Sequence, residues 1–363
     1  MYFSPILNLK NSALKALFAL FITFSSFQAV ANEEIEAKNN EHAAPHGEEK
    51  FDPTTTILEH IGDSHSFHLW GHTSMPLPVI LFTPNGLDVF SSSKLMDEHH
   101  EAIAYTGKYT YLNEEEHIKV LNASGEIDEE LSSKIYDFSI TKNVFALFLS
   151  IAVILIIFLS VAGAYRKTVG KAPKGLQSWI EPIIIFIRDD IARPNIGYKY
   201  EKFMPLLLTI FFFIWINNLL GLIPIFPGSA NVTGNIAITM VLATIVLIVV
   251  NVNGNKYYWS HIFKPDVPFW LLPIMWVVEI IGVFSKPFAL MIRLFANITA
   301  GHIIVLSLVS LIFIFKTIAI APVSVAFVIF MDVLELLVAF LQAFIFTMLT
   351  ALFIGTAVEE HHH

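Results

Sequence analysis

The sequence predicts an all-α, multi-pass integral membrane protein with an extracytoplasmic segment near its N-terminus. Composition is the first reason: 55% of the 363 residues are apolar and 15% are charged, whereas soluble domains average about 45–50% and about 25%. The second reason is uneven charge. Residues 32–142 hold 21 acidic residues against 7 lysines, a net charge of −14, and residues 143–363 hold 10 acidic against 13 basic residues, a net charge of +3. Neither part has the strongly basic balance that nucleic-acid binding requires.

The first 31 residues have the three parts of a secretory signal. Lys10 and Lys15 form a basic flank, residues 16–22 form a short apolar core, and Ala29-Val30-Ala31 is an ending of small residues. A further transmembrane helix, the alternative, needs about 20 apolar residues, and this core is shorter. We therefore predict a signal peptide over residues 1–31, cleaved after Ala31, and an extracytoplasmic location for the residues that follow.

Residues 32–142 form the acidic extracytoplasmic segment. Its first part, residues 32–53, lacks apolar periodicity and has the composition of a disordered chain. Further on, residues 67–70, 78–82 and 105–111 have the composition of short strands or ordered loops, and no period decides between the two.

Histidines are frequent in this segment. The spacing of His65, His68 and His72 would present all three to one metal ion if they lay on a helix. Gly71 and the neighbouring aromatic residues argue against a helix there. The chain also has no cysteine to add as a ligand. We therefore expect a histidine-rich soluble segment and no metal site.

The membrane part, residues 143–363, begins with a span over residues 144–162, which are uncharged at all 19 positions. Four basic residues follow directly, and the positive-inside rule then puts that end of the span in the cytoplasm. This orientation agrees with the secretory signal. We predict a location in the cell inner (plasma) membrane, with the N-terminal segment outside and the C-terminus in the cytoplasm. The basic residues are Arg166, Lys167, Lys171 and Lys174.

Three segments of ordinary length come next. Residues 176–198 are apolar but carry five charged side chains, which suits one interfacial helix better than a span. Residues 203–226 and 235–252 are long enough and apolar enough to cross the bilayer.

The last two segments, residues 267–315 and 317–358, bring the number of membrane-embedded helical segments to five. As straight helices they would be roughly 60–75 Å long, about twice the ~30 Å hydrocarbon core. Each must therefore break or tilt. Pro273 and Pro287 allow bends in the first, whereas the second contains only Pro322, near its start. The second segment is predicted to be a long tilted helix packed along another large protein surface.

Ionisable residues occur at bilayer depth in these two segments. Each costs on the order of 2.5–3.5 kcal/mol on insertion scales, so by default such residues mark an ion or substrate path. Structural alternatives exist, because Lys286 and Lys316 can extend to the interface, and Glu279 can pair with Lys286 two turns away. Arg293 is the best functional candidate, because its flanks are apolar and no loop residue is near.

Helix geometry brings several of these residues together. If the two segments are antiparallel helices with Arg293 level with Gln342, His302 lies about 13.5 Å beyond Arg293 along the axis. Glu335 then lies about 10.5 Å from Gln342 in the same direction. The expected result is a histidine and a glutamate at nearly one depth, with Arg293 and Gln342 at another.

Two further acids extend the pattern. Asp332 is one turn from Glu335 and shares its face, either as an additional acid of the path or as a structural helix residue. Glu279 lies about 21 Å from Arg293 in the opposite direction. The pattern is a polar path from one side, a fixed cation midway and a second path from the other side. No nucleotide-binding motif or nucleophile is present in the sequence, so we expect no enzymatic activity in the chain alone and no cofactor.

Three motifs resemble subunit a of the F-type ATP synthases. Residues 285–302 contain every fixed position of the family's R-L-F-x-N-x-x-A-G pattern. Residues 341–350 resemble its second signature, and residues 217–224 resemble its N-L-x-G-L-x-P turn. The resemblance runs from about Tyr136 to the C-terminus. It does not cover residues 32–135, which are longer than the family's usual N-terminal arm.

The resemblance implies a role for each site residue. Arg293 would be the essential cation that faces the rotor carboxylate, and Glu279 would line the inner half-channel. Many bacterial members have a glutamate at the position of His302 and a histidine at the position of Glu335, so the two residue types are exchanged in this chain. That exchange supports neighbouring positions for the two. The residues of the outer half-channel would be Asn297, His302, Glu335 and Gln342, with Asp332 as a possible addition from its helix face.

The function implied by the resemblance is that of the proton-translocating stator subunit of an ATP synthase, with two offset half-channels. Its partners would be a rotor ring of apolar proteolipids (subunit c), the peripheral stalk subunit b, the rest of the complex and membrane lipid. The alternative is a proton-coupled secondary transporter. Such transporters usually contain internal repeats, and residues 143–250 and 267–358 show none. A non-transporting assembly or sensor protein is a second alternative, but it would not need Arg293, His302, Glu335 and Gln342 inside membrane segments.

Overall fold

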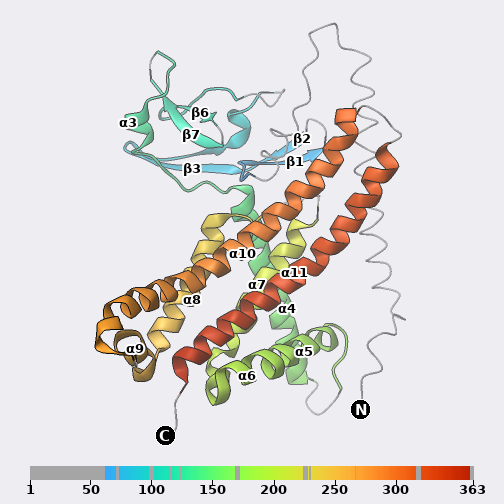
Figure 1. Ribbon diagram of the computed structural model, residues 1–363. Helices are drawn as coiled ribbons and strands as arrows, with labels where there is room; N and C mark the ends of the chain where they lie inside the picture. Colours follow the sequence, from blue (N-terminus) through green and yellow to red (C-terminus); the bar gives the residue numbers. More distant parts are fainter. Residues whose placement is uncertain are drawn as a thin grey trace.

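The structure is a computed structural model that describes residues 62–70, 73–97, 102–114, 116–122, 124–167, 172–223, 228, 230–265, 267–315 and 320–359. The expected signal peptide and residues 32–61 lie outside this described part, as do His72, Lys171, Lys316 and the four last residues. Within it, a small β domain sits at one end of a bundle of long helices (Figure 1).

The β domain corresponds to the second half of the acidic segment. Where the sequence left strands and loops open, the structure has strands, and they form three small antiparallel sheets. The all-α prediction therefore describes the membrane part, and the segment before it is a β domain. The sheets are β1 (Ser66–Trp70) with β2 (Thr73–Pro76); β3 (Pro78–Thr83) between β4 (Gly86–Ser91) and β8 (Tyr136–Asp137); and β6 (Thr110–Glu114) between β5 (Tyr105–Thr106) and β7 (His117–Leu121), with a short helix α3 (Glu129–Ser132) after β7.

The rest of the described chain is helical. Five of its helical stretches are long and apolar enough to cross a membrane, which confirms the multi-pass prediction. The helices are α4 (Lys142–Lys167), α5 (Leu176–Phe186), the π-helical η2 (Ile187–Ala192), α6 (Arg193–Ile196), η3 (Gly197–Lys199), α7 (Tyr200–Gly221), α8 (Ile236–Asn253), α9 (Lys256–Phe263), η4 (Phe269–Leu271), α10 (Leu272–Phe315) and α11 (Ala321–Val358).

The expected interfacial helix, residues 176–198, is present as α5, η2, α6 and η3, which cross one end of the bundle before α7 begins (Figure 1). Three of its five charged side chains pair with each other. Asp189 forms ion pairs of 2.8 Å with Arg188 and with Arg193, so these charges satisfy one another beside an otherwise apolar helix. Its depth relative to the membrane stays a prediction.

The two long segments are each one continuous helix. α10 has 44 residues and passes through Pro287 without a break, and α11 has 38 residues. They lie side by side and run in opposite directions (Figure 1). Since neither breaks, both must tilt to fit about 30 Å of hydrocarbon.

The buried core lies behind this helix pair. Leu207 and Phe211 of α7 are fully buried and belong to one apolar cluster with Ile354 of α11. Gly355 allows α11 to approach α6, because a Cβ at this position would overlap the carbonyl oxygen of Asn195. The far end of α11 is thereby fixed against the helices that cross the bundle.

The β domain is tied to the start of α4. The Asp63 carboxylate accepts a hydrogen bond from the Thr141 hydroxyl (2.8 Å) and one from the backbone N–H of Asn143 (3.1 Å). Asp63 thus caps the first span from about 80 residues away in sequence, a role that favours a negative charge at a helix N-terminus.

His65 strengthens the same junction. It is buried, with its Nδ1 3.4 Å from Glu116 and its Nε2 3.5 Å from Asp137. Burial by itself lowers the pKa of His65, but the hydrogen bonds and charges of Asp137 and Glu116 outweigh it and raise the pKa to about 9. His65, a candidate metal ligand from its spacing in the sequence, is therefore a charged residue that links β8 to the β6–β7 turn through Asp137 and Glu116. Among the described residues, no group of three histidine or acidic side chains could hold a metal ion.

Candidate functional site

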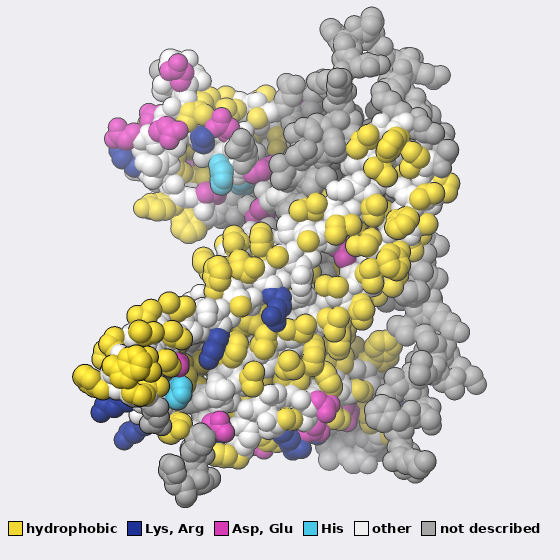
Figure 2. All heavy atoms as spheres, in the orientation of Figure 1, with side chains coloured by type: hydrophobic (Ala, Val, Ile, Leu, Met, Phe, Trp, Pro, Cys, Tyr) yellow, Lys and Arg dark blue, Asp and Glu magenta, His cyan; other side chains and the backbone are white. Residues whose placement is uncertain are grey.

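Arg293 lies on the outward face of α10. Its side chain is exposed, and no described acidic residue forms an ion pair with it. Its neighbours Phe288 and Ile292 are exposed as well. Figure 2 shows hydrophobic side chains over most of the face that α10 and α11 present, with a few charged ones among them. A cation on an apolar membrane face is costly unless a counter-charge or water reaches it, so it marks a functional site by default.

One contact fixes the register of the two long helices. A Cβ added to Gly301 of α10 would overlap the carboxylate of Glu335 and would lie 2.9 Å from its Cδ. Counting back along α10 and forward along α11, Arg293 is level with Ala343, one residue from Gln342. This agrees with the register assumed from the sequence to within one residue.

His302 follows Gly301 and therefore lies at the depth of Glu335. It is nine residues after Arg293, which turns its side chain about 180° around the helix. Accordingly His302 is half-buried and its Nε2 points toward the end of α7, 3.9 Å from where a Cβ of Gly221 would lie. Among the described residues, no hydrogen bond joins His302 to Glu335, so they are neighbours in depth and not a bonded pair.

The end of α7 adds buried amides to this region. Asn218 is buried, donates to the carbonyl of Ala339 in α11 (3.4 Å) and accepts from the Thr233 hydroxyl (2.6 Å). The side-chain oxygen of Asn217 and both side-chain polar atoms of Asn231 are buried and have no hydrogen-bond partner within the part of the chain that the structure describes. Such atoms are costly in a dry apolar interior and are commonly satisfied by ordered water.

The other predicted residues of the helix pair differ in how far they are exposed. Asn297 is exposed one turn beyond Arg293, on the same face. Gln342 is buried, whereas Asp332 and Glu335 are half-buried on α11. Along the helix pair, His302 and Glu335 lie on the side of Arg293 that is nearer the β domain, together with Asn217 and Asn218 at the end of α7 and Asn231 after it.

Glu279 lies near the opposite end of α10, at the corner with α9. Its carboxylate is 3.8 Å from Nδ1 of His261, a residue that the sequence analysis missed. The alternative that Glu279 pairs with Lys286 is wrong, because the Lys286 ammonium lies over the ring of Phe353, 5.6 Å from its centroid. The signal for His261 was weak, because it is one histidine in a loop-like stretch.

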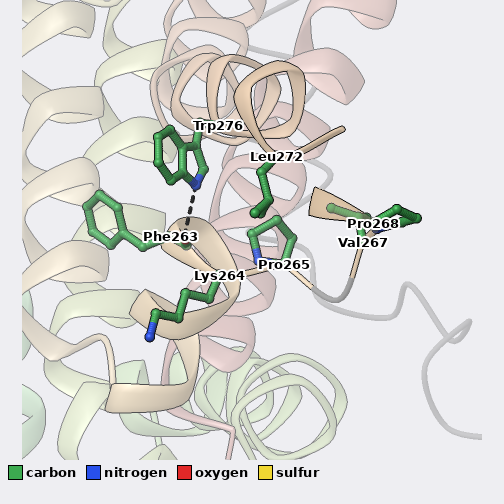
Figure 3. Close-up of a pocket in the computed structure, with 7 residues that line it drawn as sticks. All are labelled: Phe263, Lys264, Pro265, Val267, Pro268, Leu272 and Trp276. Carbon is green, nitrogen blue, oxygen red and sulfur yellow. Dashed lines mark hydrogen bonds between the residues drawn. The ribbon is translucent and has the colours of Figure 1, made fainter. Parts of the chain in front are cut away.

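The corner itself is held by a hydrogen bond from the Trp276 indole to the carbonyl of Phe263, 2.8 Å long (Figure 3). Beside it is a surface hollow of about 640 Å³ whose described lining carries one charge, on Lys264. Because this lining lacks acids and histidines, the hollow is a structural feature of the corner. Its lining residues are Phe263, Lys264, Pro265, Val267, Pro268, Leu272 and Trp276.

Comparison with known proteins decides the family. The family described as "ATP synthase A chain" matches residues 144–355. The chain belongs to the ATP synthase subunit a family. Relatives named ATP synthase subunit a include one from Chloroherpeton thalassium, 49% identical over 233 residues that make up 63% of this chain and 69% of the relative. One from Myxococcus xanthus is 43% identical over 234 residues, 62% of this chain and 75% of the relative.

Membership in the subunit a family confirms the predicted role. The chain is the proton-translocating stator subunit, a membrane part of the ATP synthase without catalysis of its own, and nothing supports the transporter alternative. The β domain has a separate match. Residues 56–138 match a family described as "Domain of unknown function (DUF8433)".

Proposed function

We propose that protons reach and leave the rotor carboxylate beside Arg293 through two half-channels that open on opposite sides of the membrane. The β domain and the start of α4 face the outside, and α9 with the basic end of α4 faces the cytoplasm. The placement of Arg166 and Lys167 at that end of α4 supports this orientation through the positive-inside rule.

The outer half-channel runs past the end of α7 to the helix pair. His302 and Glu335 form its titratable centre, and Asn217 and Asn231 supply buried polar atoms that can hold water. Asn297 and Gln342 continue it toward Arg293, and Asp332 lies one turn on the other side of Glu335, toward the outer opening. The support is that His302, Glu335 and the end of α7 lie on the side of Arg293 that is nearer the β domain.

The inner half-channel opens at the corner of α9 and α10. Glu279 and His261 are its acid and imidazole, 3.8 Å apart. Glu279 is about 21 Å from Arg293 along α10, whereas His302 is about 13.5 Å away in the other direction. The two paths are therefore offset on either side of the arginine, and neither crosses the membrane alone.

The single observation that carries the proposal is that Arg293 is exposed on an apolar helix face and has no ion-pair partner among the described residues. Its partner is the carboxylate of the rotor proteolipid ring (subunit c), which packs along α10 and α11. An opposite charge within about 4–6 Å keeps a carboxyl group ionised in such an interface. Arginine does this without releasing a proton, because its guanidinium group stays protonated in proteins. The peripheral stalk subunit b completes the set of partners.

An exchange experiment tests the outer path. If His302 and Glu335 serve one site, the double variant His302→Glu with Glu335→His should pump protons better than either His302→Ala or Glu335→Ala. ATP-driven pumping in inverted vesicles measures this, with assembly checked by purification of the complex. A double variant as inactive as the worse single variant would count against a shared site.

A further inference from the structure

The sheet β4-β3-β8 has two apolar faces. Its inner face, with Val79, Leu81 and Phe90, is buried in the core of the β domain. The alternating residues point the other way, as the strand period requires. Phe82 pairs across the sheet with both Leu87 and Tyr136, so these three share the outer face.

This outer face is exposed. Val89 of β4 lies on it opposite Ile80, and Phe138 extends the same alternation past β8, where its N–H donates to the carbonyl of Ile80. The exposed fractions are 53% for Phe82, 55% for Leu87, 56% for Val89, 64% for Tyr136 and 68% for Phe138.

An antiparallel sheet with one face in water normally alternates apolar and polar residues. Here the second face is apolar too, and contiguous exposed apolar patches mark contact with another molecule or with a membrane. The outer face carries no acidic or basic side chain of the three strands, because Asp88 and Asp137 pair across the sheet with Leu81 of the inner face. A charged partner is therefore disfavoured.

The position of the patch identifies its partner. Phe138, at one edge of the patch, is four residues before Lys142, where the first span begins, so this edge lies within about 15 Å of that point. On α4, Phe148 and Ile151 are exposed apolar residues of a lipid-crossing helix. Figure 1 shows β3 along the edge of the domain nearest the helices, and Figure 2 shows hydrophobic side chains on that underside.

We propose that this outer face, the lipid-facing sheet of Phe82, Leu87, Val89, Tyr136 and Phe138, rests in the interfacial layer of the outer leaflet. Aromatic side chains, three of the five, are well suited to that layer. Contact is through apolar insertion, so it does not depend on lipid charge or on salt. The β domain thereby lies on the membrane beside α4 and is held at a fixed height by Asp63 and His65. The inference rests on the outward orientation given above.

Depth-dependent quenching tests it in the assembled complex. The chain has no cysteine, so Phe82→Cys and Leu87→Cys each give a single site for an environment-sensitive fluorophore in proteoliposomes of zwitterionic lipid. The matched control is Ser124→Cys, an exposed site in the turn after β7. Lipids brominated near the headgroup quench from the membrane, and iodide quenches from water.

The expected result is that positions 82 and 87 are quenched by the brominated lipid, and by iodide at least about threefold less than position 124. High salt should leave this unchanged. Iodide quenching equal to that at position 124 would overturn the proposal. Protection from iodide without quenching by lipid would also overturn it, because the cover would then be protein. Position 124 reports the orientation separately, since external iodide reaches it only if the β domain is outside.

Discussion

Raising the pH should loosen the contact between β8 and the β6–β7 turn, next to the start of α4, because it discharges His65. The pKa of this imidazole is about 9 in the folded protein against 6.5 when unrestrained. The folded state therefore binds the proton more tightly, and its extra stability is full below about pH 6.5 and lost as the pH rises through about 9. The difference between these two pKa values, at 1.36 kcal/mol per pH unit, corresponds to about 3 kcal/mol of stability.

On the acid side, burial raises the pKa values of Glu116 and Asp137, but their hydrogen bonds to His65 outweigh it and hold both below their usual range. Their contribution is lost only as the pH falls through those lowered values.

Hydrogen exchange on the full chain in lipid nanodiscs measures this effect. After correction for the intrinsic exchange rate, the opening free energy of peptides around β8 and the start of α4 should fall by about 3 kcal/mol between pH 6.5 and 9.5. Peptides in the middle of α7 serve as the internal control. The variant His65→Gln should start lower and show no such slope. Equal protection of the junction at both pH values in the unmodified chain would refute the argument.

Two further predictions concern the register and the orientation. Gly301→Ala should reduce proton-driven ATP synthesis at least about tenfold in an assembled complex, because its methyl group displaces the Glu335 carboxylate. Gly282→Ala is the control, since a Cβ there meets nothing within 4 Å. Equal activity of the two variants would contradict the contact between Gly301 and Glu335. A membrane-impermeant maleimide should label Ser93→Cys in intact cells and Ser260→Cys only in inverted vesicles, both positions being exposed; the opposite pattern would reverse the topology.

Much of the membrane part could be predicted because its physics is simple. Long uncharged runs locate α4, α7 and α8 to within a few residues, and the lengths of the last two segments require tilt. The register was an assumption that set Arg293 level with Gln342, and the contact between Gly301 and Glu335 agrees with it to within one residue. Ionisable groups are rare enough in apolar helices that few arrangements bring them together.

The β domain could not be predicted in the same way. Its strands have two to six residues, too few for a period to stand out. The ion pairs of His65 are made with Glu116 and Asp137, which are 51 and 72 positions away in sequence. Likewise His261 becomes a neighbour of Glu279 only through the fold of α9 against α10. Such long-range pairs leave no local pattern.

Proton pumping by complexes that carry Arg293→Ala tests the central claim most directly. Inverted vesicles should show assembled complex but no ATP-driven acidification, and Arg293→Lys should fail as well, because a buried lysine can lose its proton where arginine cannot. Lys286→Ala is the matched control, a cation on the same helix that contacts the ring of Phe353, and it should keep most of the activity. An assembled Arg293→Ala complex that acidifies vesicles at the unmodified rate would contradict the account.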